Sequence, residues 1–173
     1  MKQIWLLILF AALTAISGGC KPSPSAAPTE SSAHPSIPTE AQPKLATIKL
    51  WIGAQEMTAE MALTGLQEQT GMMFRTNMAE NEGMIFVLPQ PMQARFWMMN
   101  TFLPLSAAYI SPTGTILEIH DLQPKDTNEV VAATGNIQFV LETKQGWFKS
   151  NNIGVGTVMS TERGPLQKVF LGR

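Results

Sequence analysis

The sequence predicts an α+β domain that is mainly β, a small curved antiparallel sheet or a partly open barrel of about seven or eight short strands with one or two short helices. Three observations lead to this prediction. Apolar and polar residues alternate with a period of two in several short segments. Glycine and proline separate these segments at short intervals. Residues 45–173 also hold three of the four tryptophans and seven of the eight phenylalanines, enough for one core.

Two alternating segments open this domain and predict a β-hairpin. Residues 46–52 place isoleucine and leucine at every second position, and residues 55–62 do the same with methionine and alanine. Gly53 and Ala54 separate the two segments, and a short pair of this kind is typical of a tight hairpin turn.

A short helix is predicted next, over residues 64–69. Thr64 is a suitable N-cap because its hydroxyl can accept a hydrogen bond from the first turn, and Gly71 is a suitable C-terminal stop. Further on, Pro89 is expected to end a strand, and the run from Pro112 to Gly114 predicts a turn. The remaining predicted strands are residues 83–88, 95–99, 105–110, 115–119, 137–142 and 154–159, with a second short helix from Trp147.

The first 19 residues resemble a bacterial lipoprotein signal peptide. Lys2 precedes an apolar run over residues 4–16, which is too short for a membrane span but fits a secretory signal. Small residues then lead to Cys20, the only cysteine of the chain. We therefore expect an exported protein of the cell envelope that is lipid-anchored to a membrane through Cys20. The alternative is an ordinary signal peptide cut near Gly19.

Residues 20–44 are predicted to be a disordered linker that starts at the lipidated cysteine. The segment 21–44 holds six of the twelve prolines and many small polar residues, but almost no large apolar ones. Such a composition buries too little apolar surface to offset the entropy of ordering the chain. A single globular domain over residues 45–173 would follow, held away from the membrane.

Composition excludes several classes of function. The predicted domain has nine Lys and Arg residues against eleven Asp and Glu residues, so it lacks the basic excess of a nucleic-acid-binding protein. One cysteine and two histidines are too few for a Cys/His zinc cluster. No phosphate loop, dinucleotide fingerprint or Gly-x-Ser-x-Gly motif occurs in the sequence. We therefore expect no cofactor and no metal.

Four segments carry a resemblance to a known family. They are Gly-Met-Met-Phe-Arg at 71–75, Gly-Met-Ile-Phe-Val at 83–87, Phe-Trp-Met-Met-Asn-Thr at 96–101 followed by Pro-Leu, and Val-Leu-Glu at 140–142 with glycines behind it. In this order and spacing they are similar to the domain-of-unknown-function family 192, over roughly residues 58–159.

This resemblance implies a small, mainly β fold in proteins that are often exported and have no established activity. The family usually has an acid after the Pro-Leu pair and another after the last glycine. This chain has Ser106 and Thr157 at those positions. Any metal or acid/base role of those acids elsewhere in the family is therefore in doubt here.

Five residues near these motifs are the candidate ligand-binding residues: Arg75, Trp97, Asn100, Thr101 and Glu142. Asn100 either orients a ligand through its amide or satisfies backbone groups in a turn. Arg75 either holds an anion or pairs internally, and Glu142 is its expected partner because a carboxylate on a core strand needs a cation or several donors.

Two other patterns receive a structural interpretation. Nine of the eleven methionines lie between Met57 and Met99 and are expected to fill the core, although a methionine-rich binding groove is the alternative. His120 and Asp121 are neighbours on a predicted strand, and adjacent strand residues point to opposite faces, so they should not act as a pair.

Together these features favour a membrane-anchored envelope protein whose domain binds a ligand or a protein partner without catalysis, and a monomer is assumed. An envelope hydrolase that uses Arg75, Asn100 and Glu142 is the alternative, although no activated nucleophile is evident. A purely structural domain is the third possibility. Whether the protein is an enzyme stays open, with the non-catalytic interpretation preferred.

Overall fold

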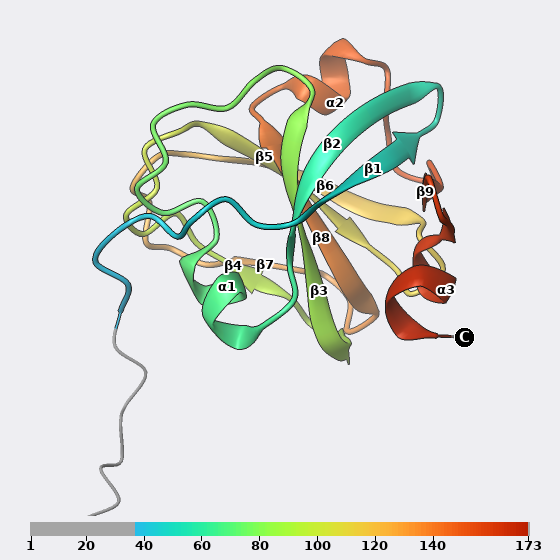
Figure 1. Ribbon diagram of the computed structural model, residues 1–173, viewed down its shortest axis with the longest axis horizontal. Coiled ribbons are helices and arrows are strands. Elements are labelled where there is room, and N and C mark those ends of the chain that lie inside the picture. Colours follow the sequence, from blue (N-terminus) through green and yellow to red (C-terminus); the bar gives the residue numbers. More distant parts are fainter. Residues whose placement is uncertain (1–36, 173) are drawn as a thin grey trace, which may run out of the picture. The chain divides into compact units, whose positions relative to one another are not determined.

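The computed structural model describes residues 37–172 (Figure 1). The predicted signal peptide over residues 1–19, the lipidation site Cys20 and the predicted linker as far as residue 36 lie outside the described residues. Within residues 37–172, no helix is both long and apolar enough to cross a membrane.

The described chain forms short strands with three short helices between or after them. The strands are β1 (Thr47–Ile52), β2 (Gln55–Ala62), β3 (Glu82–Met92), β4 (Arg95–Phe96), β5 (Leu105–Ile110), β6 (Ile116–Leu122), β7 (Val130–Val131), β8 (Ile137–Lys144), β9 (Met159–Thr161) and β10 (Gly164–Pro165). The helices are α1 (Gly65–Thr70), α2 (Trp147–Ser150) and α3 (Leu166–Leu171).

Eight of these strands form one mixed sheet in the order β10-β9-β1-β2-β3-β8-β5-β6, and β4 pairs separately with β7. The sheet is not closed, but an isolated bridge joins Thr115, just before β6, to Val158, just before β9. The mainly β, partly open architecture expected from the sequence is therefore confirmed.

One strand pair departs from the antiparallel expectation. β2 and β3 run parallel, with Ala59 opposite Gly83, while the other pairs in the sheet are antiparallel. The reason is the connection between them, since a parallel pair needs a crossover and this crossover contains α1 (Figure 1). The crossover places α1 beside one face of the sheet, where the candidate site lies.

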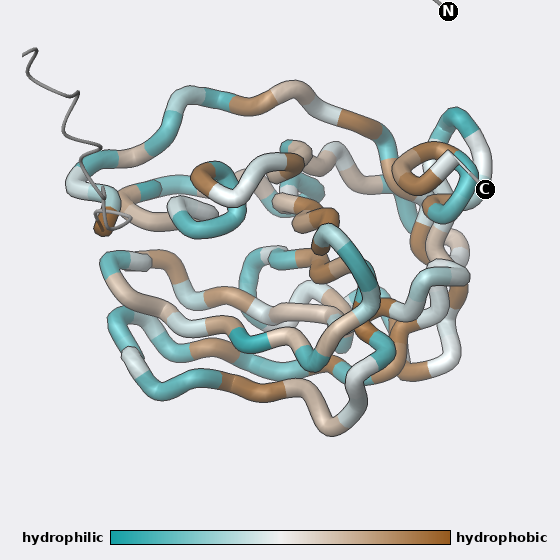
Figure 2. Tube along the Cα trace, turned by 90° about the horizontal axis from the view of Figure 1, so that it is seen from below, coloured by the Kyte–Doolittle hydropathy of each residue, from teal (hydrophilic) through white to brown (hydrophobic). Residues whose placement is uncertain are grey.

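The central strands β5 and β8 are buried on both faces. All six residues of β5 are buried, and β8 is buried from Ile137 to Thr143. Two hydrophobic clusters result. One contains Phe139 and Leu141 of β8, and the other contains Val140 with Met72, Phe86 and Tyr109. Figure 2 shows hydrophobic and hydrophilic residues interspersed along several segments of the chain.

Most of the predicted hairpin and helix ends are confirmed. Ile52 and Gln55 are partners across a hairpin whose turn holds Gly53 at a φ of 60°. The Thr64 hydroxyl accepts from the backbone N–H of Gln67, and the Gln67 side chain returns to the N-cap backbone, which completes a capping box. The helix ends at Gly71, where φ is 45°.

Other element ends differ from the prediction. Pro89 does not end β3, which continues to Met92. The pairing of β2 with β3 stops at Phe86, so beyond that point the missing N–H of proline breaks no bond on that side. The predicted strand 95–99 shortens to β4, and the predicted strand 154–159 is a loop whose last residue begins β9. β10 and α3 were not predicted from the sequence.

The last residues of the predicted linker contact the domain. The Gln42 side-chain amide donates to the carbonyls of Gln67, at 3.2 Å, and Gly71, at 2.9 Å. The backbone N–H of Leu45 donates to Glu60 Oε2 at 2.7 Å. The segment before β1 is therefore held against α1 and β2.

Candidate functional site

A pocket with a volume of about 260 Å³ opens between α1, β3, β4 and β8. Its lining combines apolar, aromatic and acidic side chains. The lining residues are Gly65, Glu68, Gln69, Thr70, Gly71, Met72, Met73, Phe86, Leu88, Arg95, Phe96, Trp97, Thr101 and Glu142. Three of the five candidate residues, Trp97, Thr101 and Glu142, therefore meet at one site.

Glu142 is the chemically distinctive residue of this pocket. Its partners across the sheet are Met84 on β3 and Ala107 on β5, which both belong to the second hydrophobic cluster. Glu142 is only 4% exposed. Within residues 37–172 its carboxyl group forms no hydrogen bond and no ion pair. Burial raises the pKa of Glu142 to about 8 because the charged form loses its hydration.

The position of Glu142 depends on a close approach between two strands. A Cβ atom at Gly83 would lie 2.8 Å from the backbone oxygen of Glu142 and 2.9 Å from Met57 Sδ. Both distances are too short for a side chain, so glycine at this position allows β3 to lie directly against β8.

Trp97 and Thr101 contribute different groups to the pocket wall. Trp97 is 40% exposed, and its indole N–H has no hydrogen-bond partner within the described part of the chain. Thr101 is buried, and its hydroxyl donates to the carbonyl of Met99 at 3.3 Å. Trp97 can therefore contact a ligand, whereas the hydroxyl of Thr101 is already engaged in its own turn.

Two charged residues lie on the α1 and β4 sides of the pocket. Burial raises the pKa of Glu68 above its ordinary value. Arg95 donates to Glu129 Oε2 at 3.1 Å, in an exposed ion pair. Arg95, the cation of the pocket wall, is therefore already paired with a carboxylate. Glu68 and Glu142 form no ion pair within residues 37–172.

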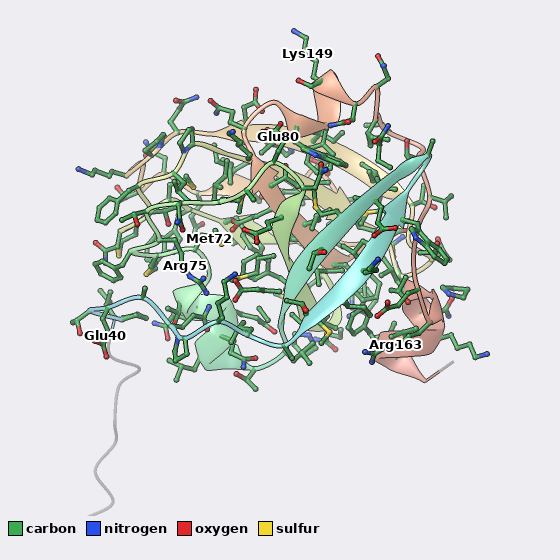
Figure 3. All side chains as sticks on the ribbon, turned by 45° about the horizontal axis from the view of Figure 1, so that its top comes forward. Glu40, Met72, Arg75, Glu80, Lys149 and Arg163 are labelled. Atoms are coloured by element: carbon green, nitrogen blue, oxygen red, sulfur yellow. The ribbon has the colours of Figure 1, made fainter. Side chains whose placement is uncertain are left out.

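The expected pairing of Arg75 with Glu142 is wrong. Arg75 pairs with Glu60 of β2 through two hydrogen bonds, Nη1 to Oε1 at 3.1 Å and Nη2 to Oε2 at 2.9 Å. It lines a second pocket, of about 470 Å³, together with Glu60 and Met72 (Figure 3 labels Arg75 and Met72). The turn after α1 directs Arg75 toward β2, while β8 directs Glu142 toward the first pocket.

Asn100 has a backbone role in the structure. Its φ is 55°, in the left-handed region that asparagine adopts more readily than most residues. Its carbonyl accepts from the N–H of Phe74 at 2.8 Å. Its side chain does not line the first pocket and forms no hydrogen bond within residues 37–172. Asn100 therefore takes part in a turn through its backbone, but its amide does not satisfy the backbone groups there as the turn interpretation expected.

The two positions at which the family resemblance implies acids lie outside the first pocket. The Ser106 hydroxyl donates to Asp121 Oδ1 at 2.5 Å and accepts from the N–H of Gly146 at 2.9 Å. Thr157 Oγ1 accepts from the N–H of Gly154 at 3.4 Å. Both hydroxyl groups therefore hold local backbone or strand geometry.

His120 and Asp121 have separate partners, as the strand geometry predicted. His120 Nε2 lies 2.9 Å from Glu118 Oε2, and its ring packs against Tyr109 at 5.1 Å between centroids. The Tyr109 hydroxyl donates to the carbonyl of Val130 at 2.6 Å. Burial, with the charges of Glu142 and Glu118, raises the pKa of Tyr109 above its ordinary value.

Most of the family-motif methionines are core residues. Met72, Met73, Met84 and Met98 are buried, and Met72 and Met73 also form part of the first pocket wall. Within residues 37–172, no group of three or more His, Asp or Glu side chains is arranged to hold a metal ion.

The sequence that carries these features matches the model of a known family. The family model DUF192, described as "Uncharacterized ACR, COG1430", matches residues 48–161, which is more than half of the chain. The chain belongs to the DUF192 family. The match runs from β1 to β9 and includes the first pocket. Comparison with curated protein sequences finds no match.

Solved structures share the fold of this DUF192 domain. A protein from Sinorhizobium meliloti 1021, described as a candidate transcription regulator, is 27% identical with a TM-score of 0.66, over 70% of this chain and 98% of that one. A protein of unknown function from Novosphingobium aromaticivorans DSM 12444 is 28% identical with a TM-score of 0.63, over 67% of this chain and 86% of that one.

Sequence reasoning missed two acidic residues of this DUF192 domain. Glu68 lies on α1, and its place in the predicted helix gave no sign that the helix would face a pocket. Glu60 lies on β2, and its pairing with Arg75 depends on the parallel crossover. The aromatic residues Phe86 and Phe96 were within the family motifs, so the motifs were the available signal for the pocket wall.

Proposed function

We propose that this DUF192 domain binds a small organic ligand in the pocket between α1, β3, β4 and β8. The observation that carries the proposal is Glu142, a residue that is 4% exposed, lines the pocket and has no partner for its carboxyl group within residues 37–172. Burying a carboxyl group without partners costs free energy, and an apolar residue there would avoid that cost. A ligand that supplies the missing partner accounts for its presence.

The surroundings of Glu142 support this proposal. Ligand pockets are mostly apolar with a few polar groups that orient the ligand. Here Met72, Phe86 and Phe96 supply the apolar wall, and Trp97 adds an exposed ring whose N–H has no partner within residues 37–172. A group with a raised pKa inside such a pocket is typical of a binding or catalytic site.

A screen of small organic compounds tests the proposal. We would record ligand-observed NMR of the full chain and of two tryptophan variants. Trp97→Ala removes part of the pocket wall, whereas Trp51→Ala removes a tryptophan that is similarly exposed, at 46%, but lies on β1. We expect hits that Trp97→Ala weakens and Trp51→Ala does not. The absence of hits, or equal effects of both variants, would contradict the proposal.

An envelope hydrolase is the second candidate, and one observation favours it. A carboxyl group with a pKa of about 8 is protonated at neutral pH and suits a general acid. The pocket hydroxyl groups do not supply a nucleophile, because Thr70 and Thr101 both donate to backbone carbonyls. Turnover of ester or amide substrates that Glu142→Gln abolishes would favour the enzyme over the binding protein.

Nucleic-acid binding has less support. One structural neighbour is described as a candidate transcription regulator. In this chain residues 45–173 have nine basic against eleven acidic residues, and two acidic residues line the first pocket. A nucleic-acid surface needs the opposite charge.

We also propose that the protein is held at a membrane of the cell envelope by a lipid on Cys20. The support is the apolar segment over residues 4–16, the small residues behind it and the single cysteine. Two or three acyl chains bury enough methylene groups for stable anchoring. Detergent phase partitioning and mass spectrometry of the full chain test this. Cys20→Ser should move the protein to the aqueous phase, and an unmodified cysteine in the wild type would exclude the anchor.

A further inference from the structure

The charges around the first pocket are unbalanced. Glu142 lies in the pocket with no cation or donor within residues 37–172, and Glu68 adds a second carboxylate from α1. Arg95 is the lining residue with a positive charge, and Glu129 matches it at 3.1 Å. An anionic ligand would meet two acidic residues here, and within residues 37–172 the cation of the pocket wall is already paired.

The aromatic and apolar side chains of the pocket wall suit the apolar body of an organic cation. Phe86, Phe96 and Trp97 present aromatic rings, whose faces attract positive charge. Met72 and Met73 add polarizable thioether groups. An ionised carboxylate is an acceptor only, so Glu142 in that form needs donors that a protonated amine has and a carboxylate ligand lacks.

We propose that the pocket takes a small organic ammonium ion, which donates to the buried Glu142 carboxylate while its apolar body lies against Phe96 and Trp97. This inference rests on the proposed ligand-binding function and adds the chemical class of the ligand. Glu68 adds attraction from the α1 side of the pocket.

Binding of an ammonium ion is coupled to a proton. The titratable and charged groups around Glu142 are Glu68 from α1, Arg95 from β4 and Tyr109 from β5, with Glu118 of β6 acting on Tyr109. Because burial holds the pKa of Glu142 near 8, the empty pocket holds the neutral acid at pH 7. The ammonium ion favours the ionised form, so binding releases that proton to the solvent.

Three probes with one ring and different head groups test the inference. They are 2-phenylethylammonium, 2-phenylethanol and phenylacetate, titrated calorimetrically into the full chain in buffers of different ionisation enthalpy. We expect the ammonium ion to bind about tenfold or more tightly than the alcohol. At pH 7 the wild type should release about 0.9 proton for each bound ammonium ion, given a pKa of about 8.

Variants assign this effect to the two carboxylates. Glu142→Gln should abolish the proton release and reduce the preference for the ammonium ion over the alcohol. Glu68→Gln, on a partly exposed helix, should weaken ammonium binding several-fold without changing alcohol binding, and it keeps the test valid if Glu142→Gln does not fold. Glu56→Gln is the matched control, because Glu56 pairs with Lys49 outside the pocket.

The outcomes separate the inference from the function on which it rests. If the ammonium ion does not bind, or binds no better than the alcohol or phenylacetate, the ammonium assignment is overturned. The ligand-binding function survives that result as long as the compound screen gives hits that depend on Trp97. If the screen gives none, both fail.

Discussion

Arg75 and Glu60 join three segments that are far apart in the chain. Arg75, in the turn after α1, holds both carboxylate oxygens of Glu60 on β2, and Glu60 Oε2 also accepts from the N–H of Leu45 before β1. Both side chains are 14% exposed. An ion pair this buried, with two parallel hydrogen bonds, holds much more strongly than a surface pair.

We expect Arg75→Ala to lower the free energy of unfolding by about 2–3 kcal/mol, because Glu60 then stays buried without its cation. Chemical denaturation measures the change. Arg95→Ala is the control, since Arg95 and Glu129 are 54% and 49% exposed, and its loss should cost less than about 1 kcal/mol. Equal effects of the two variants would show that the Arg75 pair does not hold the fold.

The stability of the protein should fall as the pH rises through the range in which Glu142 ionises. Its pKa is about 8 when folded and 4.5 in the ordinary state, so the folded protein binds the proton more tightly than the unfolded chain. The stabilisation is complete below the ordinary pKa and is lost as the pH rises toward the folded pKa.

Comparison with Glu142→Gln isolates this effect, because the amide does not ionise. Between pH 5 and pH 9 the wild type should lose roughly 4 kcal/mol of unfolding free energy relative to Glu142→Gln, given the two pKa values. Denaturation at pH 5, 7 and 9 measures it. Parallel pH profiles would mean that Glu142 titrates normally.

Two substitutions at Asn100 separate a backbone role from a side-chain role. Asn100→Ala should cost about 1 kcal/mol more than Asn100→Gly, because alanine is strained at a φ of 55° and glycine is not. Thermal unfolding checks the difference. If Asn100→Gly keeps full stability but loses the ligands found by the compound screen, the amide has a binding role after all.

Ser106 should matter for stability although it lies outside the first pocket. Ser106→Ala removes the partner of the Gly146 N–H and of Asp121, which should lower the free energy of unfolding by about 1–3 kcal/mol. Ser150→Ala, on the exposed side of α2, is the control and should be nearly neutral. A neutral Ser106→Ala would mean that water replaces the hydroxyl without cost.

Local patterns were sufficient for much of the fold. The hairpin at Gly53 follows from two alternating segments around a short turn, and the start of α1 follows from a cap and its reciprocal partner at Gln67. These features depend on residues within a few positions of one another. The ends of strands that depend on distant neighbours were less predictable. β3 continues past Pro89 because β2 no longer pairs with β3 at that point, so the missing N–H of proline breaks no bond there.

For the candidate site as well, local patterns indicated residues but not the contacts between distant ones. The motifs drew attention to Trp97, Thr101 and Glu142, which meet at one pocket, and to Arg75, which lines another. The sequence left open whether Arg75 holds an anion or pairs internally, and for the internal pair it pointed to Glu142 where the structure has Glu60. Glu60 and Glu142 are both strand residues, and their local sequences do not show which one faces the turn after α1.

The amino-acid sequence alone was enough for the family, the mainly β class and the short-range turns and caps, because these depend on periodicity and on neighbouring residues. The direction of β2 against β3, the partner of Arg75 and the isolation of Glu142 in a pocket depended on how distant strands pack. The crossover through α1 joins the parallel strands β2 and β3, and it brings Arg75 to Glu60 and α1 to the pocket that Glu142 lines.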